Sequence, residues 1–473
     1  MPSYRTLLLG CTVGAALGAC SLAPPYTRPS TPPTAPVYAE AGSWITAHPT
    51  DTIDRGPWWE IYRDQQLDAL ERRATAGNLD LQAELSRLEE ARAQARIARA
   101  GIFPQLDAGS TATHYSQSLH SPLYVPPTID SDYTLEGDFS YEVDVWGRIR
   151  NATKSAELGA QATEADLAAL NLAVHAEVAS DYFTLHGEDA QQALLDRTVA
   201  DYQRALELTQ ALHRGGLAPH SDVDQANAQL QSAVTQSHEL RLQRKETQHA
   251  LAVLLGESAS LFHLDAKPLP INTAPPPIDP GLPSTLLERR PDIAAAERRV
   301  AAANAQIGVA RAAYFPVFSL VGGIGSESDR TANWLSAPSM LWSFGSSAAL
   351  SLFDGGRRRA RTLEARAAYE EDVARYRGTV VAAYRDVEDS LAALQELGLE
   401  SASESAAVIA TKRALEQSRE QYRAGLISYL QVVVIENAAL ATQLAATDIA
   451  MRRMNASIAL VEALGGGWRE PRT

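Results

Sequence analysis

The sequence predicts an α+β protein in which long helices alternate with pairs of strands long enough to cross a membrane. Three observations lead to this fold class: an internal two-fold repeat, polar and apolar alternation in several segments, and long proline-free stretches with helical periodicity. Residues 91–104 and 303–316 match at a constant spacing of 212 positions, and Gly216 matches Gly425 at a spacing of 209. Each half is therefore expected to contain a helix, two strands, a very long helix, a turn and a second long helix.

Residues 1–19 have the features of a secretory signal. Arg5 precedes a short apolar stretch that is too short to span a bilayer. The segment that ends in Ala19 and Cys20 resembles the lipobox of bacterial lipoproteins, which implies a lipid such as palmitate on Cys20. Ser21, in place of an aspartate, then implies transport to the outer membrane. The alternative is an ordinary signal peptide, after which Cys20 would remain as a lone unpaired cysteine.

Composition excludes some classes of protein. The net charge of −15 and the pI near 5.2 argue against nucleic-acid binding, which needs a basic face. Beyond the signal, the sequence has no uncharged apolar run of the roughly 18 residues that a spanning helix needs. If the chain crosses a membrane, it must therefore do so as a β-barrel.

In the predicted strand 133–146, residues 133–145 alternate apolar and polar side chains without a fault. The apolar set is Tyr133, Leu135, Phe139, Tyr141 and Val143, and the acidic set is Glu136, Asp138, Glu142 and Asp144. This pattern is typical of a tilted transmembrane strand with a lipid-facing and a water-facing side, and Trp146 would then lie in the aromatic girdle. The acidic set would line the lumen and favour cations, or would form a solvated face with no selectivity.

Three further segments, 105–115, 316–325 and 341–353, are predicted to be the partner strands. Alternation of this kind also occurs in half-buried soluble sheets. The export signal and the long helices that flank the strands favour a membrane barrel. Four strands cannot enclose a channel, because even eight-stranded barrels are filled by their own side chains. The protein is therefore expected to oligomerise.

The helices are predicted to project far from the strands. Between Gly147 and His213, about 65 residues contain no proline and would extend roughly 100 Å as a helix. A soluble coiled-coil stalk would show the same periodicity. Residues 214–219 stop this helix, Ser221 and Asp224 are expected to cap the next one, and residues 423–426 repeat the break. These two turns would form the tip.

The predicted organisation of the chain has six parts. They are a signal peptide at 1–19, a lipid anchor with a proline-rich tether and equatorial segment at 20–60, repeat 1 at 61–267, a linker at 268–283, repeat 2 at 284–467 and a C-terminal tail at 468–473. Because each kind of element occurs in both repeats, structural zones should combine segments from both.

Several motifs together resemble one known family. They are Leu287-Glu288-Arg289-Arg290-Pro291-Asp292-Ile293, Tyr314-Phe315-Pro316, Phe353-Asp354-Gly355-Gly356-Arg357, Trp58-Trp59 and the segment 463–468. They are similar to those of TolC-like outer-membrane factors, in the NodT-like lipoprotein branch of RND-type efflux systems. The resemblance covers essentially the whole mature chain.

The resemblance implies a trimer that extends from the outer membrane into the periplasm. Its β-barrel, with four strands from each chain, would continue into a long periplasmic α-helical barrel. It would be a passive exit duct for small molecules delivered by an inner-membrane RND-type pump and a periplasmic adaptor protein. It would need no cofactor apart from the lipid on Cys20.

The resemblance also implies a gate at the tip. The family closes its tunnel with carboxylates just after the helix break, where Asp222 falls, with Asp224 nearby. Gln431 and Val434 stand where a pair of aspartates is often found. We therefore expect a gate made of Asp222 and an apolar constriction at 432–434. The alternative is that both aspartates only stabilise a helix N-terminus.

Catalytic and metal-binding motifs are missing from the sequence, so no enzyme and no metal site is predicted. His213 and His220 flank the helix break and are expected to be exposed turn residues. Two other functions stay open: an outer-membrane channel for type I secretion, and a lipid-anchored periplasmic coiled-coil scaffold that would not need the strands.

Overall fold

The computed structural model describes residues 21–33, 35, 38–41, 56–120, 129–278 and 290–466. The signal peptide, Cys20 and the tail at 468–473 lie outside these ranges. The chain divides into two compact units. Unit 1 comprises Met1–Ser30, Arg87–Glu164 and Ala295–Arg377, and unit 2 comprises Thr31–Ser86, Ala165–Ala294 and Gly378–Thr473. Each unit thus combines segments from both halves of the sequence.

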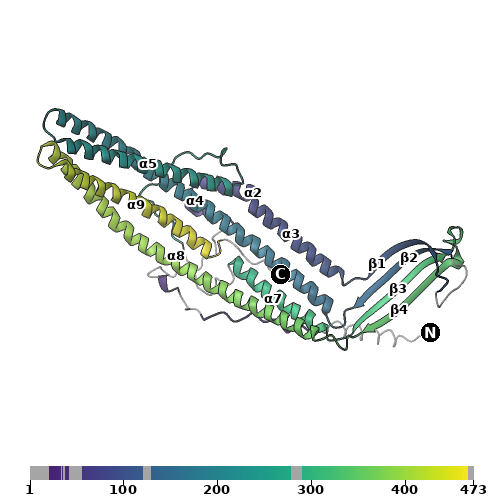
Figure 1. The fold of residues 1–473 in the computed structure, drawn as a ribbon. Helices are drawn as coiled ribbons and strands as arrows, with labels where there is room; N and C mark the ends of the chain where they lie inside the picture. The colour runs from purple at the N-terminus through teal and green to yellow at the C-terminus, as the bar shows by residue number, and fades with distance from the viewer. Residues whose placement is uncertain are drawn as a thin grey trace. The chain divides into compact units, whose positions relative to one another are not determined.

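From α3 onward, the first half has the same order of elements as the described second half (Figure 1). The first half contains α2 (Gln65–Gly77), α3 (Leu79–Ala100), β1 (Gln105–Ser116), β2 (Ile129–Val143), α4 (Arg148–Arg214) and α5 (His220–Leu254). The second contains α7 (Pro291–Ala312), β3 (Val317–Ser328), β4 (Met340–Ala349), α8 (Arg357–Arg423) and α9 (Tyr429–Ala463). Corresponding helices have equal lengths: 22 residues for α3 and α7, 67 for α4 and α8, and 35 for α5 and α9.

The four strands form one antiparallel sheet in the order β1-β2-β3-β4. Its register places apolar side chains in line across the sheet, as in the row Leu106, Phe139, Gly322 and Phe344. The next row, on the opposite face, is Asp107, Asp138, Gly323 and Ser343. The alternation predicted for β2 and β4 is therefore confirmed. The sheet has one mainly apolar face and one more polar face, although Val317, Val321 and Leu341 lie on the more polar one.

The strand ends differ from the prediction. β2 runs from Ile129 to Val143 instead of 133–146, and β4 ends at Ala349 instead of 353. Trp146 therefore lies beyond the strand, where its ring stacks on Phe315 at 4.6 Å and its Nε1 donates to the carbonyl oxygen of Pro316. Residues 105–116 and 317–328, by contrast, extend the predicted strands β1 and β3 by one and three residues.

Side-chain caps explain why β2 and β4 end early. The Asp144 carboxylate accepts hydrogen bonds from the backbone N–H groups of Ile149 and Arg150. The Asp354 carboxylate accepts from the N–H groups of Gly356 and Arg358 in the same way. These bonds satisfy donors at the start of α4 and α8, so each chain segment leaves the sheet to begin its long helix.

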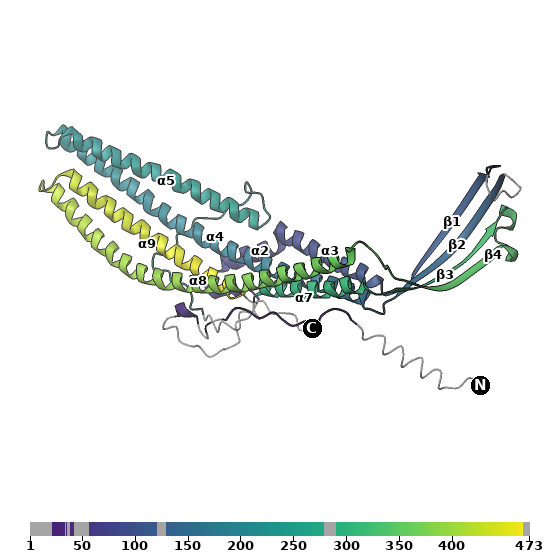
Figure 2. The same ribbon diagram turned by 60° about the horizontal axis from the view of Figure 1, so that its bottom comes forward.

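In unit 2, α4 and α5 run side by side and antiparallel, as do α8 and α9 (Figure 2). One buried cluster joins helices of both pairs, and its members are Tyr202, Leu206, Ala226, Leu230, Ala233, Tyr429 and Val432. A second cluster, nearer the middle of the helices, contains Leu195, Leu240 and Leu440. The apolar positions that recur at helical spacing therefore pack the two pairs together.

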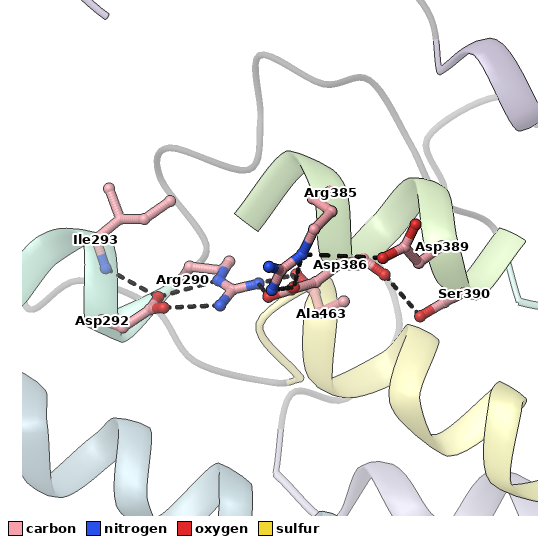
Figure 3. Close-up of polar contacts among 8 residues, drawn as sticks. All are labelled: Arg290, Asp292, Ile293, Arg385, Asp386, Asp389, Ser390 and Ala463. Atoms are coloured by element: carbon pink, nitrogen blue, oxygen red, sulfur yellow. Dashed lines mark hydrogen bonds and ion pairs between the residues drawn. The ribbon is translucent and has the colours of Figure 1, made fainter. Parts of the chain in front are cut away.

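Arg290 connects three helices of unit 2 at the beginning of α7 (Figure 3). Its guanidinium binds both carboxylate oxygens of Asp292 at 2.7 and 3.0 Å, lies 3.3 Å from Asp386 on α8, and donates to the carbonyl oxygen of Ala463 on α9. The corresponding residue of the first half, Asn78, donates to the carbonyl oxygen of Leu254 at the end of α5. Both halves therefore tie the start of a short helix to the end of a long one.

A pair of buried titratable groups lies where α2 meets α4. Glu71 Oε2 is 2.6 Å from His175 Nδ1, and both residues are almost fully buried. Burial raises the pKa of Glu71 to about 9 and lowers the pKa of His175 to about 4. At neutral pH the two groups are therefore a neutral hydrogen-bonded pair, since both charged forms would lose their hydration.

Among the described helices, only α9 is long and apolar enough to cross a membrane by composition. Core helices of soluble domains meet the same criterion. α9 contributes Tyr429, Val432 and Leu440 to the clusters that hold the helix pairs of unit 2 together, and it carries the buried acid Glu436. Its apolar character is thus used in helix packing.

Candidate functional site

The two turns that end α4 and α8 have the same backbone structure and lie at the same end of unit 2 (Figures 1 and 2). Gly216 and Gly425 both have φ of 72°, which favours glycine. The N–H of Leu217 donates to the carbonyl oxygen of Leu212, and the N–H of Leu426 donates to that of Gln421. These bonds form the same C-terminal helix cap in both turns. They leave Leu217 and Leu426 more than 70% exposed (78% and 74%).

The predicted cap on α5 is wrong. The helix begins at His220 with Pro219 in the capping position, and no side chain caps it. Ser221 and Asp224 therefore do not form a capping box. Proline has a fixed φ and no side-chain acceptor, so Pro219 cannot cap the helix with its side chain. The N–H of Asp222 donates to the backbone carbonyl oxygen of Pro219.

Asp222 and Asp224 have different surroundings. Asp222 is half-buried in the first turn of α5, and its charge contributes to the raised pKa of Tyr422 on α8, after burial as the main cause. Asp224 is exposed and lies 3.8 Å from the Nε2 atom of His220. Of the two carboxylates, only Asp222 therefore acts on the neighbouring helix pair.

The start of α9 presents a mixed surface. Gln431 and Val434 are exposed, and Val434 keeps 62% of its surface accessible. Val432, expected in the apolar constriction, is instead buried in the cluster with Tyr202 and Leu206. The exposed apolar side chains here are Leu430 and Val434, four residues apart on one face of the helix.

A buried ion pair lies just above the turns. Arg419 of α8 donates from Nε and Nη2 to Oε1 of Glu436 on α9, at 3.1 and 2.8 Å. Its Nη1 lies 3.6 Å from Asp201 of α4, so one guanidinium connects three helices. Glu436 is only 3% exposed, and its Oε2 has no hydrogen-bond partner among the described residues. These groups line a cavity of about 320 Å³ together with Tyr422 and Tyr429.

Burial dominates the electrostatics of this cavity. It raises the pKa of Glu436, and Arg419 opposes that shift. It also raises the pKa of Tyr429 and Tyr422, whose rings lie 5.4 Å apart. The network connects three helices, and one buried carboxylate oxygen in it is left without a hydrogen bond, which is costly in a low-dielectric interior.

Sequence reasoning missed Arg419, Glu436 and Asp201. Arg419 and Glu436 are 17 residues apart on either side of the turn, and Asp201 comes from the other half of the chain. One signal was available: Glu436 interrupts an otherwise apolar segment of α9. An acid at such a position is expected to have a cationic partner.

The acidic strand residues do not all remain on the sheet. Glu136, Asp138 and Glu142 lie on its polar face, and Glu142 also pairs with Arg148 at 2.6 Å. Asp144 lies beyond β2 and caps α4. The register adds Asp107 on β1, directly opposite Asp138, and Glu327 on β3. None of the four strands contains lysine or arginine. Acidic side chains lie on the polar face of β1, β2 and β3, and β4 contributes Ser343, Gly345 and Ser347 to it.

Metal binding finds no support in the described ranges, which contain no group of three or more histidine, cysteine or acidic side chains arranged for a metal ion. His213 and His220 lie with ring centroids 5.2 Å apart. The Nδ1 of His213 is 2.9 Å from the carbonyl oxygen of Ala218. This contact is consistent with the expected role of His213 as a turn residue.

Comparisons with known proteins agree with this architecture. Residues 70–257 and 282–466 match the family described as outer membrane efflux protein. The chain is 33% identical to the outer membrane protein OprJ of Pseudomonas aeruginosa over 458 residues, which cover 97% of this chain and 95% of OprJ. It is 29% identical to the cation efflux system protein CusC of Escherichia coli over 471 residues, 98% of this chain and 99% of CusC.

Solved structures have the same fold. A membrane protein from Pseudomonas aeruginosa superposes with a TM-score of 0.86 at 32% identity, covering 96% of this chain and 99% of that one. The open state of the Neisseria gonorrhoeae outer membrane channel MtrE gives a TM-score of 0.81 at 26% identity, with 95% and 99% covered. The chain belongs to the outer membrane efflux protein family, and it is an outer-membrane channel protein of an efflux system.

Proposed function

We propose that three copies of this chain form a passive conduit from the periplasm to the outside of the cell. Each copy would supply four strands to a closed twelve-stranded barrel and four long helices to a tunnel beneath it. The matched lengths of the elements support an origin by duplication, with repeats at 61–267 and 284–467 joined by the linker at 268–283. Small molecules delivered by an inner-membrane pump and a periplasmic adaptor would leave through it.

The two-faced sheet with unpaired edges is the observation that carries this proposal. Leu106, Phe344 and Trp342 lie on the apolar face and are between 69% and 79% exposed. The opposite face is acidic. Among the described residues of one chain, β1 and β4 each have one edge without a strand partner. Unpaired backbone groups cost several kcal/mol each in lipid. The two outer strands of the four-stranded sheet would therefore have to pair with strands of other copies.

Engineered disulfides test this closure. The natural chain has two cysteines, Cys11 and Cys20, both before the first strand. Gly109→Cys on β1 would be combined in turn with Ser343→Cys, Gly345→Cys or Ser347→Cys on β4. A Cβ at Gly109 or Gly345 would meet nothing within 4 Å in the single chain. We expect at least one pair to give a covalent ladder that ends at the trimer on a denaturing gel.

The matched control pairs Leu135→Cys with Ser326→Cys, which are direct partners on β2 and β3. It should link within one chain and give no ladder. A ladder that ends at the dimer, or no link from any β1–β4 pair while the control links, would rule out the three-copy barrel.

The tip is the proposed docking site for the adaptor. Leu217 and Leu426 project from equivalent turns and are exposed, although leucine side chains are normally buried. Leu217→Asp combined with Leu426→Asp should reduce copurification of the adaptor without changing insertion into the outer membrane. Undiminished copurification would contradict this role.

The gate is proposed to combine Asp222, the Arg419–Glu436 pair and the exposed apolar side chain of Val434, with Asp224 and Gln431 on the rim. Asp222→Ala should raise the resting conductance of the protein in planar bilayers. Asp224→Ala, at the exposed position two residues later, is the matched comparison, and it should raise the conductance much less because Asp224 lies only on the rim. If Asp222→Ala leaves both leak and pump-coupled efflux unchanged, Asp222 serves only the helix N-terminus.

Cys20 is proposed to carry the lipid that anchors the mature N-terminus in the outer membrane. Mass spectrometry of the N-terminal peptide should show an acylated Cys20 with residues 1–19 removed. An unmodified Cys20 at the mature N-terminus would exclude the anchor.

A further inference from the structure

A cationic cavity lies in unit 1 between the N-terminal segment, α4 and α7. Its volume is about 450 Å³, and residues 21–26 form one of its walls. Three of its lining residues are cations, namely Arg150, Lys154 and Arg298, and its lining contains no carboxylate. Such a lining favours an anionic ligand.

Some cations of this cavity already have an acidic partner, and one has none among the described residues. Arg150 pairs with Asp144 at 3.1 Å, and Arg298 lies 3.4 Å from Glu297. Lys154 is exposed and forms no hydrogen bond or ion pair with any described residue.

Asn151, another lining residue, is 4% exposed, and its Nδ2 donor has no hydrogen-bond partner in the described part of the chain. This nitrogen packs against Gly308 of α7, where an added Cβ would lie 2.6 Å from it. A buried unused donor is costly unless something accepts from it. The cavity thus combines one uncompensated ammonium with one buried, unused N–H donor, and both suit phosphate oxygens.

The N-terminal segment is fixed along this cavity. Four hydrogen bonds hold it: Ser21 Oγ to Asn151 Oδ1 at 3.0 Å, Asn304 Nδ2 to the Pro24 carbonyl at 2.9 Å, Arg311 Nη1 to the Leu22 carbonyl at 3.2 Å, and Tyr26 Oη to Glu297 Oε1. A Cβ at Gly308 would lie 2.7 Å from the Cβ of Ala23, so the glycine lets the segment approach α7 closely. The segment begins directly after Cys20, the proposed site of the lipid.

The position of the cavity along the chain places it near the membrane surface. Trp146 and Phe315 stack between the sheet and the helices, and aromatic rings at the ends of barrel strands lie at the level of the lipid head groups. Lys154 follows Trp146 by eight residues, two of them before α4 begins at Arg148, so the two lie at most about 16 Å apart along the chain. A lipid head group on the periplasmic side would lie within reach.

We propose that this cavity binds the phosphate of an anionic phospholipid of the periplasmic leaflet, with Lys154 and Asn151 as the donors. The bound lipid would lie beside the acyl anchor on Cys20 and would fix the N-terminal segment to α4 and α7. This inference rests on the proposed placement of the sheet in the membrane.

Native mass spectrometry of the full-length protein, released from detergent, tests this lipid site. The two probes are phosphatidylglycerol and phosphatidylethanolamine with acyl chains of equal length. We expect phosphatidylglycerol to be retained in preference to phosphatidylethanolamine. Lys154→Ala should weaken phosphatidylglycerol binding about fivefold, the factor for one cation at an anionic surface, and Lys154→Arg should restore it. Lys245→Ala, at an exposed lysine of α5, is the matched control and should change nothing.

Three results would overturn the proposal: equal retention of both lipids, phosphatidylglycerol binding that is insensitive to Lys154→Ala, or an equal loss in Lys245→Ala. Displacement by equimolar inorganic phosphate would also overturn it, because the site would then bind free anions. Extraction of membranes with carbonate tests the proposed position of the sheet in the membrane separately from the lipid site. Wild-type protein found in the soluble fraction would contradict the position of the sheet.

Discussion

At the scale of single residues, the tip depends on one guanidinium that three helices share. Arg419 neutralises Glu436, which is almost fully buried, and also faces Asp201. Removing one member of a buried pair leaves an uncompensated charge, whereas removing both can be nearly neutral. The pair is therefore better suited to fixing one arrangement of the helices than to adding stability.

Arg419→Met is expected to lower the stability of the folded protein by about 1–3 kcal/mol, less than for a fully buried pair because the Arg419 side chain is 33% exposed. Arg419→Met combined with Glu436→Met should recover most of this loss. Thermal melting of the purified protein measures both. Arg204→Met is the control, because Arg204 pairs with the same Asp201 from an exposed position and should have little effect.

If the double variant is less stable than Arg419→Met alone, the pair stabilises the fold. Its main role would then not be to fix one arrangement of the helices. Conductance of the same variants reports on gating. The single variant should open more often than the wild type.

The Glu71–His175 pair predicts a pH dependence. Glu71 keeps its proton in the folded protein up to about pH 9, whereas the unfolded chain releases it near pH 4.5. Unfolding thus releases a proton between these values, so this group makes stability fall as pH rises. His175 acts in the opposite direction, because the unfolded chain takes up a proton below pH 6.5 and the folded one only near pH 4.

Glu71→Gln should therefore flatten the decline of the melting temperature between pH 6 and pH 9, because the amide stays neutral at every pH and can still bond to His175. Melting curves at pH 6, 7, 8 and 9 test this. Parallel declines in the wild type and the variant would show that Glu71 does not retain its proton.

At the scale of elements, Arg290 holds the start of α7 against α8 and α9 (Figure 3). Its side chain is 14% exposed, and its planar fork binds the two oxygens of Asp292. Lysine cannot reproduce this geometry with a single ammonium. In the first half, the neutral amide of Asn78 makes the equivalent bond to the carbonyl oxygen of Leu254. The second half makes this junction with the charged guanidinium of Arg290.

Arg290→Lys is expected to lower the free energy of unfolding by about 1–3 kcal/mol, since it keeps the charge but loses at least two charge-assisted hydrogen bonds. Thermal melting in detergent measures the change. Arg385→Lys, one residue before Asp386 and 67% exposed, is the control and should melt like the wild type. Equal effects of the two substitutions would contradict a special role for Arg290.

The elements also show what the sequence can and cannot predict. The 67-residue helix α4 was predictable to within about a turn, because it lacks proline and ends in a glycine pair. The two faces of β2 followed from its alternation. The strand ends were not predictable, since the caps by Asp144 and Asp354 compete locally with strand pairing. The Arg419–Glu436 pair was also missed, because it depends on how two helices pack.

At the scale of the whole molecule, a single chain leaves its membrane part incomplete. The sheet exposes a wide apolar face and two strand edges among the described residues, and in the proposed barrel closure with other copies would satisfy both in lipid. The acidic side would then line the lumen. A cation preference of the pore is the expected consequence, and the charge-neutral pair Glu136→Gln with Asp138→Asn should reduce it in measurements of reversal potential.

Electron microscopy of the purified protein in detergent tests the central claim most directly. Averages should show threefold symmetry around a hollow tube, with a helical section of about 100 Å set by the 67 residues of α4 and α8. A solid rod, or a compact particle without a central channel, would contradict the conduit.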